Sequence, residues 1–404
     1  MIRILYAWEL GAGLGHVSRF VPLARALAER GCAVTWALSD LAPAAALLPP
    51  GAATLLQAPR FRGQVTGLPE PQLAYSEVLL RHGYASAEHL SPLLREWRAL
   101  IAAARPDLII TDHAPTALLA ARGLGCARAR IGTGFCCPPA ATPEAPMMPW
   151  MPPDAARSRQ SGQQVLDSIN GALQAAGAAP LATLAQMHEA DEDFVTTYPE
   201  LDHYPQRSTP RWGAVLGSEG GLAPAWPVVL GPRVFAYLRA RQPQTAVLLR
   251  TLRRKHYATL VYCPDLTPQA RAEFQSPTLR FSDQPLDIVA VSAASDLVIC
   301  GGGHGTVCAA LLAGKPLLLM PEMAEQAITA WNVEALGAGL GLASGQESRV
   351  GALLTRLLHE PGFGRAAQEF RARHAGTAQA QIIDGIAQRC VELATQTPRP
   401  GTDT

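Results

Sequence analysis

Short apolar runs alternate with amphipathic stretches along most of the chain. Residues 2–8 form a nearly continuous apolar run, which is typical of a strand buried on both faces. A glycine loop follows, and apolar residues then recur at helical spacing over 17–28 until Gly31 ends the stretch. Residues 33–38 are the next apolar run, so the first forty residues predict a strand, a helix and a parallel strand.

The same alternation continues in two series. The first series predicts further strands at 107–111, 127–132 and 194–197, with a helix over 114–123. The stretch 205–232 is rich in proline and glycine and interrupts the pattern. The second series predicts strands at 234–238, 259–263, 279–281, 296–300 and 316–320, with helices between them.

Two α/β domains are therefore expected, each a doubly wound, Rossmann-like sheet, facing a central cleft. We place the first domain at 1–215, an interdomain linker at 216–232 and the second domain at 233–370. A C-terminal helix is expected over 371–394, packing back on the first domain, and 395–404 is expected to be a flexible tail.

Charge and cysteine usage narrow the class of protein. The formal net charge is +1 and no long cluster of basic residues occurs, which disfavours a nucleic-acid partner. The uncharged stretch 41–59 is broken by prolines, and the start of the chain lacks the features of a signal peptide. Eight scattered cysteines without a CxxC pair favour reduced thiols. We expect a cytoplasmic protein without an integral membrane segment, which leaves peripheral membrane contact open.

The loop at 11–16 is the first candidate site. Glycines that follow a parallel strand and open a helix let backbone amides approach a phosphate. His16 occupies the place where the dinucleotide fingerprint has its last glycine, and Asp40 ends the next strand, so a nicotinamide or flavin site remains an alternative. At a helix start, His16 would be held neutral and available as a base, with Asp112 to orient it. Alternatively, His16 is a polar loop histidine without a catalytic role.

Two further motifs follow strands of the second series. Cys300 is followed by three glycines, His304, Gly305 and Thr306, a pattern that exposes backbone amides and a hydroxyl to phosphate oxygens. Residues 321–326 follow the next strand and offer carboxylate and amide side chains suited to sugar hydroxyls. Taken singly, either motif could be only a turn and helix cap.

A long loop and an acidic triplet complete the candidates. Residues 138–153 are rich in proline and carry Met147, Met148 and Trp150, soft and aromatic side chains suited to an apolar acceptor. The acidic residues at 191–193 could bind a divalent metal, but their position favours a solvated end of the last helix of the first half. No His/Cys cluster has metal-ligand spacing, so we expect a metal-independent protein without a resident cofactor.

These motifs together resemble those of the GT-B glycosyltransferases, which move sugars from nucleotide diphosphates to small acceptors. The resemblance rests on GHVSRFVPLARALAERGCAVT, on PDLIITDHAPTALLAARGLG, and on GGGHGTVCAALLAGKPLLLMPEMAEQ with NVEALGAGLGL. The chain is most similar to the family 1 glucuronosyl and glucosyl transferases, with some likeness to the peptidoglycan N-acetylglucosaminyltransferases.

The resemblance implies a role for each matching residue. It makes His16 the catalytic base, oriented by Asp112, in an inverting and metal-independent transfer to a small or lipid-like acceptor. The co-substrate would be a nucleotide diphosphate sugar of the UDP or dTDP type. Residues of both series would bind this donor: Gly13, Gly15, Arg239, Phe281, Gln284, Gly302, Gly303, His304, Gly305, Thr306, Glu325 and Gln326. The acceptor would contact Met147, Met148 and Trp150.

The chain departs from the family pattern at three positions. Gly301 stands where the family usually has a histidine, Glu325 where many relatives have aspartate, and Thr329 where asparagine is often seen. A nucleotide-sugar epimerase or hydrolase on the same fold therefore remains an alternative, as does a nucleotide-binding module without catalysis.

Overall fold

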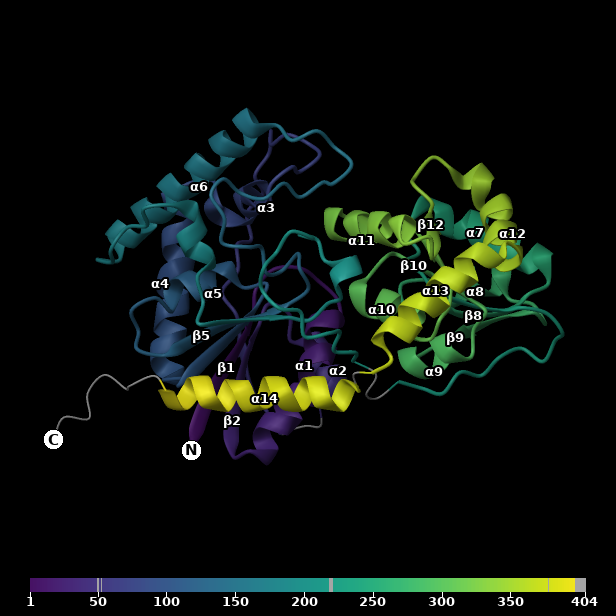
Figure 1. Cartoon of the computed structure of the whole chain (residues 1–404), viewed down its shortest axis with the longest axis horizontal. Coiled ribbons are helices and arrows are strands. Elements are labelled where there is room, and N and C mark those ends of the chain that lie inside the picture. The colour runs from purple at the N-terminus through teal and green to yellow at the C-terminus, as the bar shows by residue number, and fades with distance from the viewer. Residues whose placement is uncertain (49–50, 52, 218–220, 377, 397–404) are drawn as a thin grey trace. The chain divides into compact units, whose positions relative to one another are not determined.

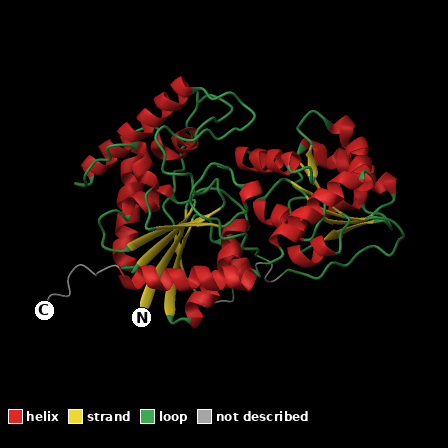
Figure 2. Ribbon diagram, viewed as in Figure 1, coloured by secondary structure: helices red, strands yellow, loops and turns green. Residues whose placement is uncertain are grey.

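The computed structural model describes residues 1–48, 51, 53–217, 221–376 and 378–396 of the chain. It divides into two compact units. The first unit comprises Met1–Gly213 and Ala380–Thr404, and the second comprises Ala214–Gln379. Each unit contains one six-stranded parallel sheet with helices around it (Figure 2). The predicted fold class, two doubly wound α/β domains, is therefore confirmed.

The first sheet has the strand order β3-β2-β1-β4-β5-β6. Its strands are β1 (Ile2–Trp8), β2 (Cys32–Leu38), β3 (Thr54–Gln57), β4 (Leu108–Asp112), β5 (Ala127–Gly132) and β6 (Glu192–Val195). The prediction missed β3, a short strand at the edge of the sheet where only two of its four residues are half-buried. Edge strands carry little apolar signal because one side of their backbone and much of their surface face solvent.

Helices of the first unit cover both faces of this sheet (Figure 1). They are α1 (Gly15–Glu29), α2 (Ala42–Leu47), α3 (Tyr75–Leu79), α4 (Ala87–Ala104), α5 (Pro115–Ala120) and α6 (Ala155–Ala175), with short helical turns at Leu80–Tyr84, Leu184–His188 and Pro199–Leu201. Helix α1 buries Val17, Phe20 and Leu27 against the sheet, as their helical spacing predicts.

The second sheet repeats this design, with the strand order β12-β11-β10-β7-β8-β9. Its strands are β7 (Arg233–Tyr237), β8 (Ala258–Tyr262), β9 (Leu279–Ser282), β10 (Leu297–Cys300), β11 (Leu317–Leu319) and β12 (Gly339–Gly341). The helices are α7 (Pro243–Lys255), α8 (Pro268–Phe274), α9 (Ile288–Ala293), α10 (His304–Leu312), α11 (Ala324–Ala335), α12 (Val350–His359) and α13 (Pro361–His374), with a short turn at Glu347–Arg349. Aliphatic side chains of β7, β10, α7 and α12 form one buried core in this unit.

The C-terminal region contains two helices where one is predicted over 371–394. Helix α13 ends at His374, and α14 (Gln379–Gln396) begins after a break that contains Gly376. Glycine weakens a helix because it loses the most backbone entropy on folding. Helix α14 runs back along the first unit (Figure 1), where Arg389 Nε donates to Glu192 Oε2 at 2.8 Å.

Each sheet has one place where the chain reverses its direction of strand addition. In the first unit the neighbours β1 and β4 lead to opposite edges, and in the second unit β7 and β10 do so. Loops leaving the carboxyl ends of two such strands diverge and open a crevice, where ligands of parallel α/β sheets bind. This rule places a candidate site after β1 and β4 and another after β7 and β10.

The region around the predicted linker contributes to the second unit. Leu222 forms an isolated bridge with Leu286, and Gln379 Nε2 donates to the Leu216 carbonyl oxygen at 2.6 Å. Residues 218–220 and the end of the predicted tail, 397–404, lie outside the described residues. All eight cysteines are buried free thiols. None of the described helices has the length and apolar character needed to cross a membrane.

Candidate active site

The first unit brings His16 and Asp112 together at its reversal point. The parallel register pairs Trp8, the last residue of β1, with Asp112, the last residue of β4. Helix α1 begins at Gly15, directly after the glycine loop, and presents His16 in its first turn. His16 Nδ1 lies 2.9 Å from Asp112 Oδ1, within hydrogen-bonding distance. The predicted pair is thus present in the fold.

Three neighbouring side chains contact the His16–Asp112 pair and hold it in place. The Tyr6 hydroxyl lies 2.9 Å from Asp112 Oδ2 and 2.9 Å from the His16 carbonyl oxygen. The Arg19 guanidinium lies 3.5 Å from Asp112 Oδ2, and the Trp8 ring stacks on the His16 imidazole with ring centroids 4.9 Å apart. Tyr6, Trp8 and Arg19 were not predicted from the sequence. A tyrosine and a tryptophan at alternate positions of an aliphatic strand were the available signal.

The electrostatic balance keeps Asp112 ionised. Burial would raise the pKa of its carboxyl group, but the charges of His16 and Arg19 and hydrogen bonds from His16 and Tyr6 lower this pKa to about 2. A buried carboxylate at Nδ1 holds the imidazole in the tautomer that leaves Nε2 unprotonated. The His16 side chain is 11% exposed. The arrangement can therefore accept a proton at Nε2 and stabilise the resulting imidazolium.

Two buried ionisable residues near this pair were also missed. Glu9 directly follows β1, accepts a hydrogen bond from the Thr116 amide at 2.9 Å, and leaves its other carboxyl oxygen without a partner. Burial raises the pKa of Glu9 to about 7. His113 has a left-handed backbone with φ of 46°, and burial together with the charge of His16 lowers its pKa to about 3. His113 is therefore a neutral imidazole at physiological pH.

Three other predicted residues of the first unit, Gly13, Gly15 and Asp40, have few neighbours or an ordinary structural contact. A side chain at Gly13 or Gly15 would meet no atom within 4 Å, so both positions border open space. Asp40, the acid of the dinucleotide alternative, accepts a hydrogen bond from the Ala42 amide at 2.9 Å, next to the start of α2. A helix-terminal carboxylate of this kind needs no ligand to explain it.

The predicted acceptor segment is partly internal. Met147 and Met148 are buried, and the Met147 amide donates to the Leu73 carbonyl oxygen at 3.0 Å. Trp150 is 37% exposed and is the one member of the trio that presents a large apolar surface. The role of all three in acceptor binding stays a prediction, with Trp150 the member best placed to contact a ligand directly.

The second unit places its glycine loop at the matching reversal point. Gly303 forms the N-cap of α10, and neither Gly303 nor Gly305 has any atom within 4 Å of the position that a side chain would take. Thr306 lies in the first turn of α10 and is half-buried. Open space before a helix amino terminus is what an approaching phosphate needs.

The acid and amide motif adjoins this loop. Gly302 has φ of 92°, and a side chain there would come within 3.0 Å of the Gln326 carbonyl oxygen. The Gln326 side chain accepts from the Glu322 amide at 2.9 Å, and Glu325 lies beside it in the first turn of α11. Gly302 thus serves the packing of the two loops, while Gly303 and Gly305 face open space.

Other predicted donor residues take different positions. His304 is buried, with Nε2 3.6 Å from Cys308 Sγ. Arg239 follows β7 and lies over the Tyr237 ring at 5.6 Å. Phe281 lies in β9 and Gln284 follows that strand. Strand β8 separates β9 from β7 in the sheet. An ion pair that was not predicted, between Arg241 and Glu322 at 3.0 Å, joins the loops after β7 and β11.

The acidic triplet is engaged in structural contacts. It lies at the start of β6 rather than at the end of a helix, since the preceding helical turn ends at His188. Asp191 accepts from the Arg128 amide at 2.7 Å, and Asp193 pairs with the Arg130 guanidinium, whose Nε lies 2.7 Å away. Among the described residues, no group of three His, Cys, Asp or Glu side chains is arranged to hold a metal ion.

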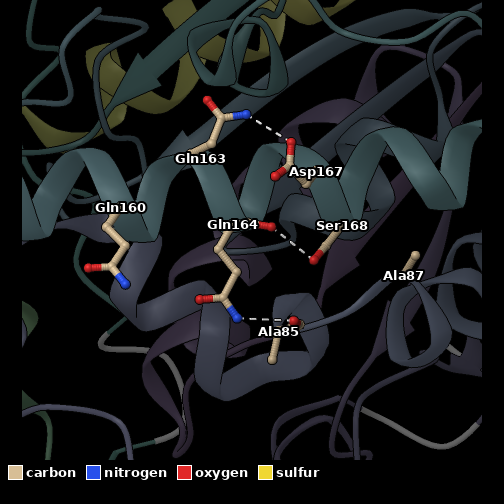
Figure 3. Close-up of a pocket in the computed structure, with 7 residues that line it drawn as sticks. All are labelled: Ala85, Ala87, Gln160, Gln163, Gln164, Asp167 and Ser168. Atoms are coloured by element: carbon tan, nitrogen blue, oxygen red, sulfur yellow. Dashed lines mark hydrogen bonds between the residues drawn. The ribbon is translucent and has the colours of Figure 1, made fainter.

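Two surface hollows of the first unit lie away from His16. One has a volume of about 610 Å³ and is lined by α6 residues and by Ala85 and Ala87 (Figure 3). Its polar groups bond to one another: Gln163 donates to Asp167 at 2.8 Å and Gln164 to the Ala85 carbonyl oxygen at 3.2 Å. The other, of about 440 Å³, borders Arg98, Arg122 and Arg128. Neither hollow contains His16 or Asp112.

Comparisons with known proteins find similar sequences and folds. Residues 246–383 match the model of the glycosyltransferase family 28 C-terminal domain, which covers about a third of the chain. A curated relative, the elloramycin glycosyltransferase ElmGT of Streptomyces olivaceus, is 44% identical over 72 residues, 18% of each chain. The matched segment therefore spans about a fifth of that relative. The family model that matches belongs to family 28, so the finer prediction of family 1 gains no support.

Solved structures resemble the whole chain. The glycosyltransferase VinC, determined in complex with dTDP, has a TM-score of 0.68 at 16% identity and is covered over 100% of its length by 98% of this chain. The spinosyn rhamnosyltransferase SpnG, complexed with thymidine diphosphate, has a TM-score of 0.66 at 20% identity, with 95% of this chain and 100% of that chain covered. These likenesses show the two-domain fold that such enzymes share.

Proposed function

We propose that this chain, which is a glycosyltransferase of the GT-B fold, moves a sugar from a nucleoside diphosphate to a hydroxyl group of a small or lipid-like acceptor. The observation that carries this proposal is the 2.9 Å contact between His16 Nδ1 and the buried Asp112 carboxylate at the reversal point of the first sheet. A histidine oriented in this way is a general base for a hydroxyl group.

The reaction is a single displacement. The acceptor hydroxyl transfers its proton to His16 Nε2 while its oxygen forms a bond to the anomeric carbon. The bond between that carbon and the diphosphate oxygen breaks, and the nucleoside diphosphate leaves with the bonding electrons. Attack from the side opposite the leaving group inverts the configuration of the anomeric carbon. Asp112 stabilises the imidazolium that forms.

The second unit is the donor site in this proposal. The open positions at Gly303 and Gly305 and the amino terminus of α10 suit a diphosphate. Glu325 and Gln326 adjoin the same loop, where sugar hydroxyls would lie. VinC and SpnG were determined with thymidine diphosphate, which favours a donor of the dTDP or UDP type for this chain.

Charge on the departing diphosphate is stabilised without a metal in this proposal. The α10 dipole and the backbone amides of its first turn provide positive potential, and Arg239 and Arg241 follow the neighbouring strand β7. Asp191 and Asp193, the acids of the metal alternative, are already committed to Arg128 and Arg130. We place the reaction in the cytoplasm, in keeping with the eight free thiols.

A transfer assay tests the proposal. The purified chain would be incubated with dTDP- and UDP-sugars and a panel of hydroxylated acceptors, and the products identified by mass spectrometry and by the configuration of the new glycosidic bond. A glycoside of inverted configuration, formed equally with and without chelator, is expected. A sugar released or epimerised equally well with no acceptor would support the hydrolase or epimerase alternative, and no turnover of any donor would support the binding module.

A further inference from the structure

Two apolar side chains protrude from the second unit just before β7. Val228 is 100% exposed and Leu230 is 99% exposed. Apart from Met1, the other large apolar side chains that are exposed in the described part of the chain are only 37–48% exposed. Contact of fully exposed aliphatic side chains with water is unfavourable, so residues 228–230, the apolar tip, suit an apolar environment supplied from outside the chain.

The backbone on both sides holds the apolar tip outward. On one side Pro227 is buried, and its carbonyl oxygen accepts from the Val229 amide at 3.1 Å, which closes a tight turn. On the other side the Pro232 carbonyl oxygen accepts from the Ala258 amide at 2.9 Å. The tip therefore projects from backbone that is anchored at both ends.

The longest run of basic residues in the chain lies beside the apolar tip. Helix α7 ends with Arg253, Arg254 and Lys255, and all three are exposed. The carbonyl oxygen of the next residue, His256, is 3.7 Å from the place of a side-chain carbon on Gly231, which directly follows the tip. Within the described residues, the three basic side chains donate to uncharged oxygens and form no ion pair with a carboxylate.

Two further arginines extend this positive surface. Arg233, at the start of β7, lies over the Trp226 ring at 5.7 Å, and Arg280 donates to the backbone of the same segment at 3.4 Å. The acids in contact with these basic residues are Asp296, which accepts from the Arg233 amide, and Glu273, whose carbonyl oxygen accepts from α7. Five basic residues outnumber the two acids, so the surface around the tip is positive.

The apolar tip and the basic residues lie at the amino ends of the strands. The tip precedes β7, and the basic end of α7 precedes β8. The glycine loop before α10 and the acid and amide motif instead follow β10 and β11, at their carboxyl ends. Because all strands of this sheet are parallel, these two sets of loops leave the sheet at opposite ends. A partner on the tip would therefore leave the proposed donor site uncovered.

We propose that this end of the second unit docks on an anionic membrane surface. Val228 and Leu230 insert at the boundary between head groups and acyl chains, and the five basic residues contact the negative head groups. A bilayer offers this combination, because its apolar chains lie directly behind a negatively charged surface. Two aliphatic side chains are too small a patch for a specific protein partner, since such an interface buries about 800 Å² on each side. The inference does not depend on the proposed function.

Vesicle sedimentation tests the docking. The full chain is sedimented with vesicles of phosphatidylcholine alone, and with vesicles of equal parts of phosphatidylcholine and the anionic lipid phosphatidylglycerol. We expect the protein to sediment with the anionic vesicles and much less with the neutral ones. Binding should weaken as salt is added, because salt screens the attraction between exposed charges.

Removing the apolar tip should weaken this binding. The double variant Val228→Ser/Leu230→Ser should melt with the wild type, because both side chains are exposed. Its affinity for the anionic vesicles should fall at least about tenfold, the effect of losing the burial of even one such side chain. Val289→Ser makes the same change at a valine of α9 that is 43% exposed, and it should bind vesicles as the wild type does.

Removing basic residues should weaken the binding through charge. Arg253→Gln/Arg254→Gln should lower the affinity for anionic vesicles roughly 30-fold at low salt, or about fivefold for each arginine. Arg95→Gln/Arg159→Gln removes the same charge from exposed positions of the first unit and should leave the affinity nearly unchanged. Equal losses in the two double variants would mean that net charge, rather than this surface, attracts the protein, and would overturn the inference.

Two other results would also overturn it. One is a wild-type protein that does not sediment with anionic vesicles, or that binds them no better than Val228→Ser/Leu230→Ser does. The other is a wild-type dimer that the same double variant separates into monomers without any vesicle binding, since the tip would then contact a second copy of the chain. Calorimetric affinity for thymidine diphosphate should be unchanged in every tip and arginine variant. Failure of the docking would thus leave the proposed function intact, and inactivity in sugar transfer would leave the docking intact.

Discussion

The two units have different kinds of residues at the same topological position. After β1 and β4, the first unit brings together four buried side chains that contact one another: His16, Asp112, Tyr6 and Trp8. After β7 and β10, the second unit instead presents glycines and the start of a helix, with open space beside Gly303. In the proposed reaction, the residues after β1 and β4 transfer the proton, and those after β7 and β10 let a ligand approach the backbone.

This difference shows how one fold can divide a reaction. A base needs a fixed tautomer, which requires a buried partner and close packing. A diphosphate needs several backbone amides and room, which requires small residues. A single unit that held both the base and the diphosphate would need close packing and open space at the same positions. Substitutions that alter the residues of one unit at a time test this division.

Blocking the open crevice should have the largest effect on binding. Gly303→Val has room for its side chain, so the variant should fold normally and melt with the wild type. Its affinity for thymidine diphosphate should fall roughly 10²-fold, because the side chain displaces phosphate from amides whose hydrogen bonds to charge are worth about 1.5–3 kcal/mol each. Calorimetry measures this, with Gly362→Val, which also borders open space, as the control. Equal affinity in both variants would move the donor elsewhere.

Neutralising the buried Asp112 carboxylate should have a smaller effect, which is confined to the turnover rate. Asp112→Asn removes the charge that stabilises the imidazolium and should lower turnover about 10-fold or more while the affinity for nucleotide stays unchanged. Combined with His16→Ala, it should add little, because the two residues act as one unit. Steady-state kinetics of both single variants and the double variant measure the coupling. Fully additive losses would mean that Asp112 acts without His16.

Glu9 should give the first unit a pH-dependent stability. Its pKa is raised from 4.5 to about 7 on folding, so the native state retains a proton that the unfolded chain loses. This contribution is fully present below about pH 4.5 and is lost as the pH rises through 7. Relative to Glu9→Gln, the wild type should lose about 2–3 kcal/mol of unfolding free energy between pH 4.5 and pH 8. Urea titrations measure this, and parallel pH curves for the two proteins would contradict it.

The sequence predicted the strands of both sheets better than the contacts between them. Strand β1 and strand β5 have the predicted bounds because buried parallel strands are continuous apolar runs. The pairing of His16 with Asp112 could be expected from their places after strands, but their contact depends on the register that pairs Trp8 with Asp112. Register is set by packing between residues 104 positions apart in the sequence and leaves no local pattern.

Some site residues left no usable signal at all. Nothing in the sequence around His113 indicates a left-handed backbone or a buried neutral ring. The methionines at 147 and 148 resemble a soft ligand surface in the sequence, whereas in the fold they are interior, because apolar residues in a long loop also serve to anchor it. The acids at 191–193 were predicted to form a solvated helix end, which is wrong, since Asp191 and Asp193 bond to residues of β5 at the start of β6.

The central claim is that the first unit supplies the base and the second unit holds the nucleotide. It is tested most directly by measuring, on one preparation of His16→Ala, both the turnover of sugar transfer and the calorimetric affinity for thymidine diphosphate. The account predicts that turnover falls by roughly 10²–10⁴-fold, the usual range for loss of a general base, while the affinity stays within experimental error of the wild type. Near-normal turnover, or a loss of nucleotide affinity equal to the loss of rate, would contradict it.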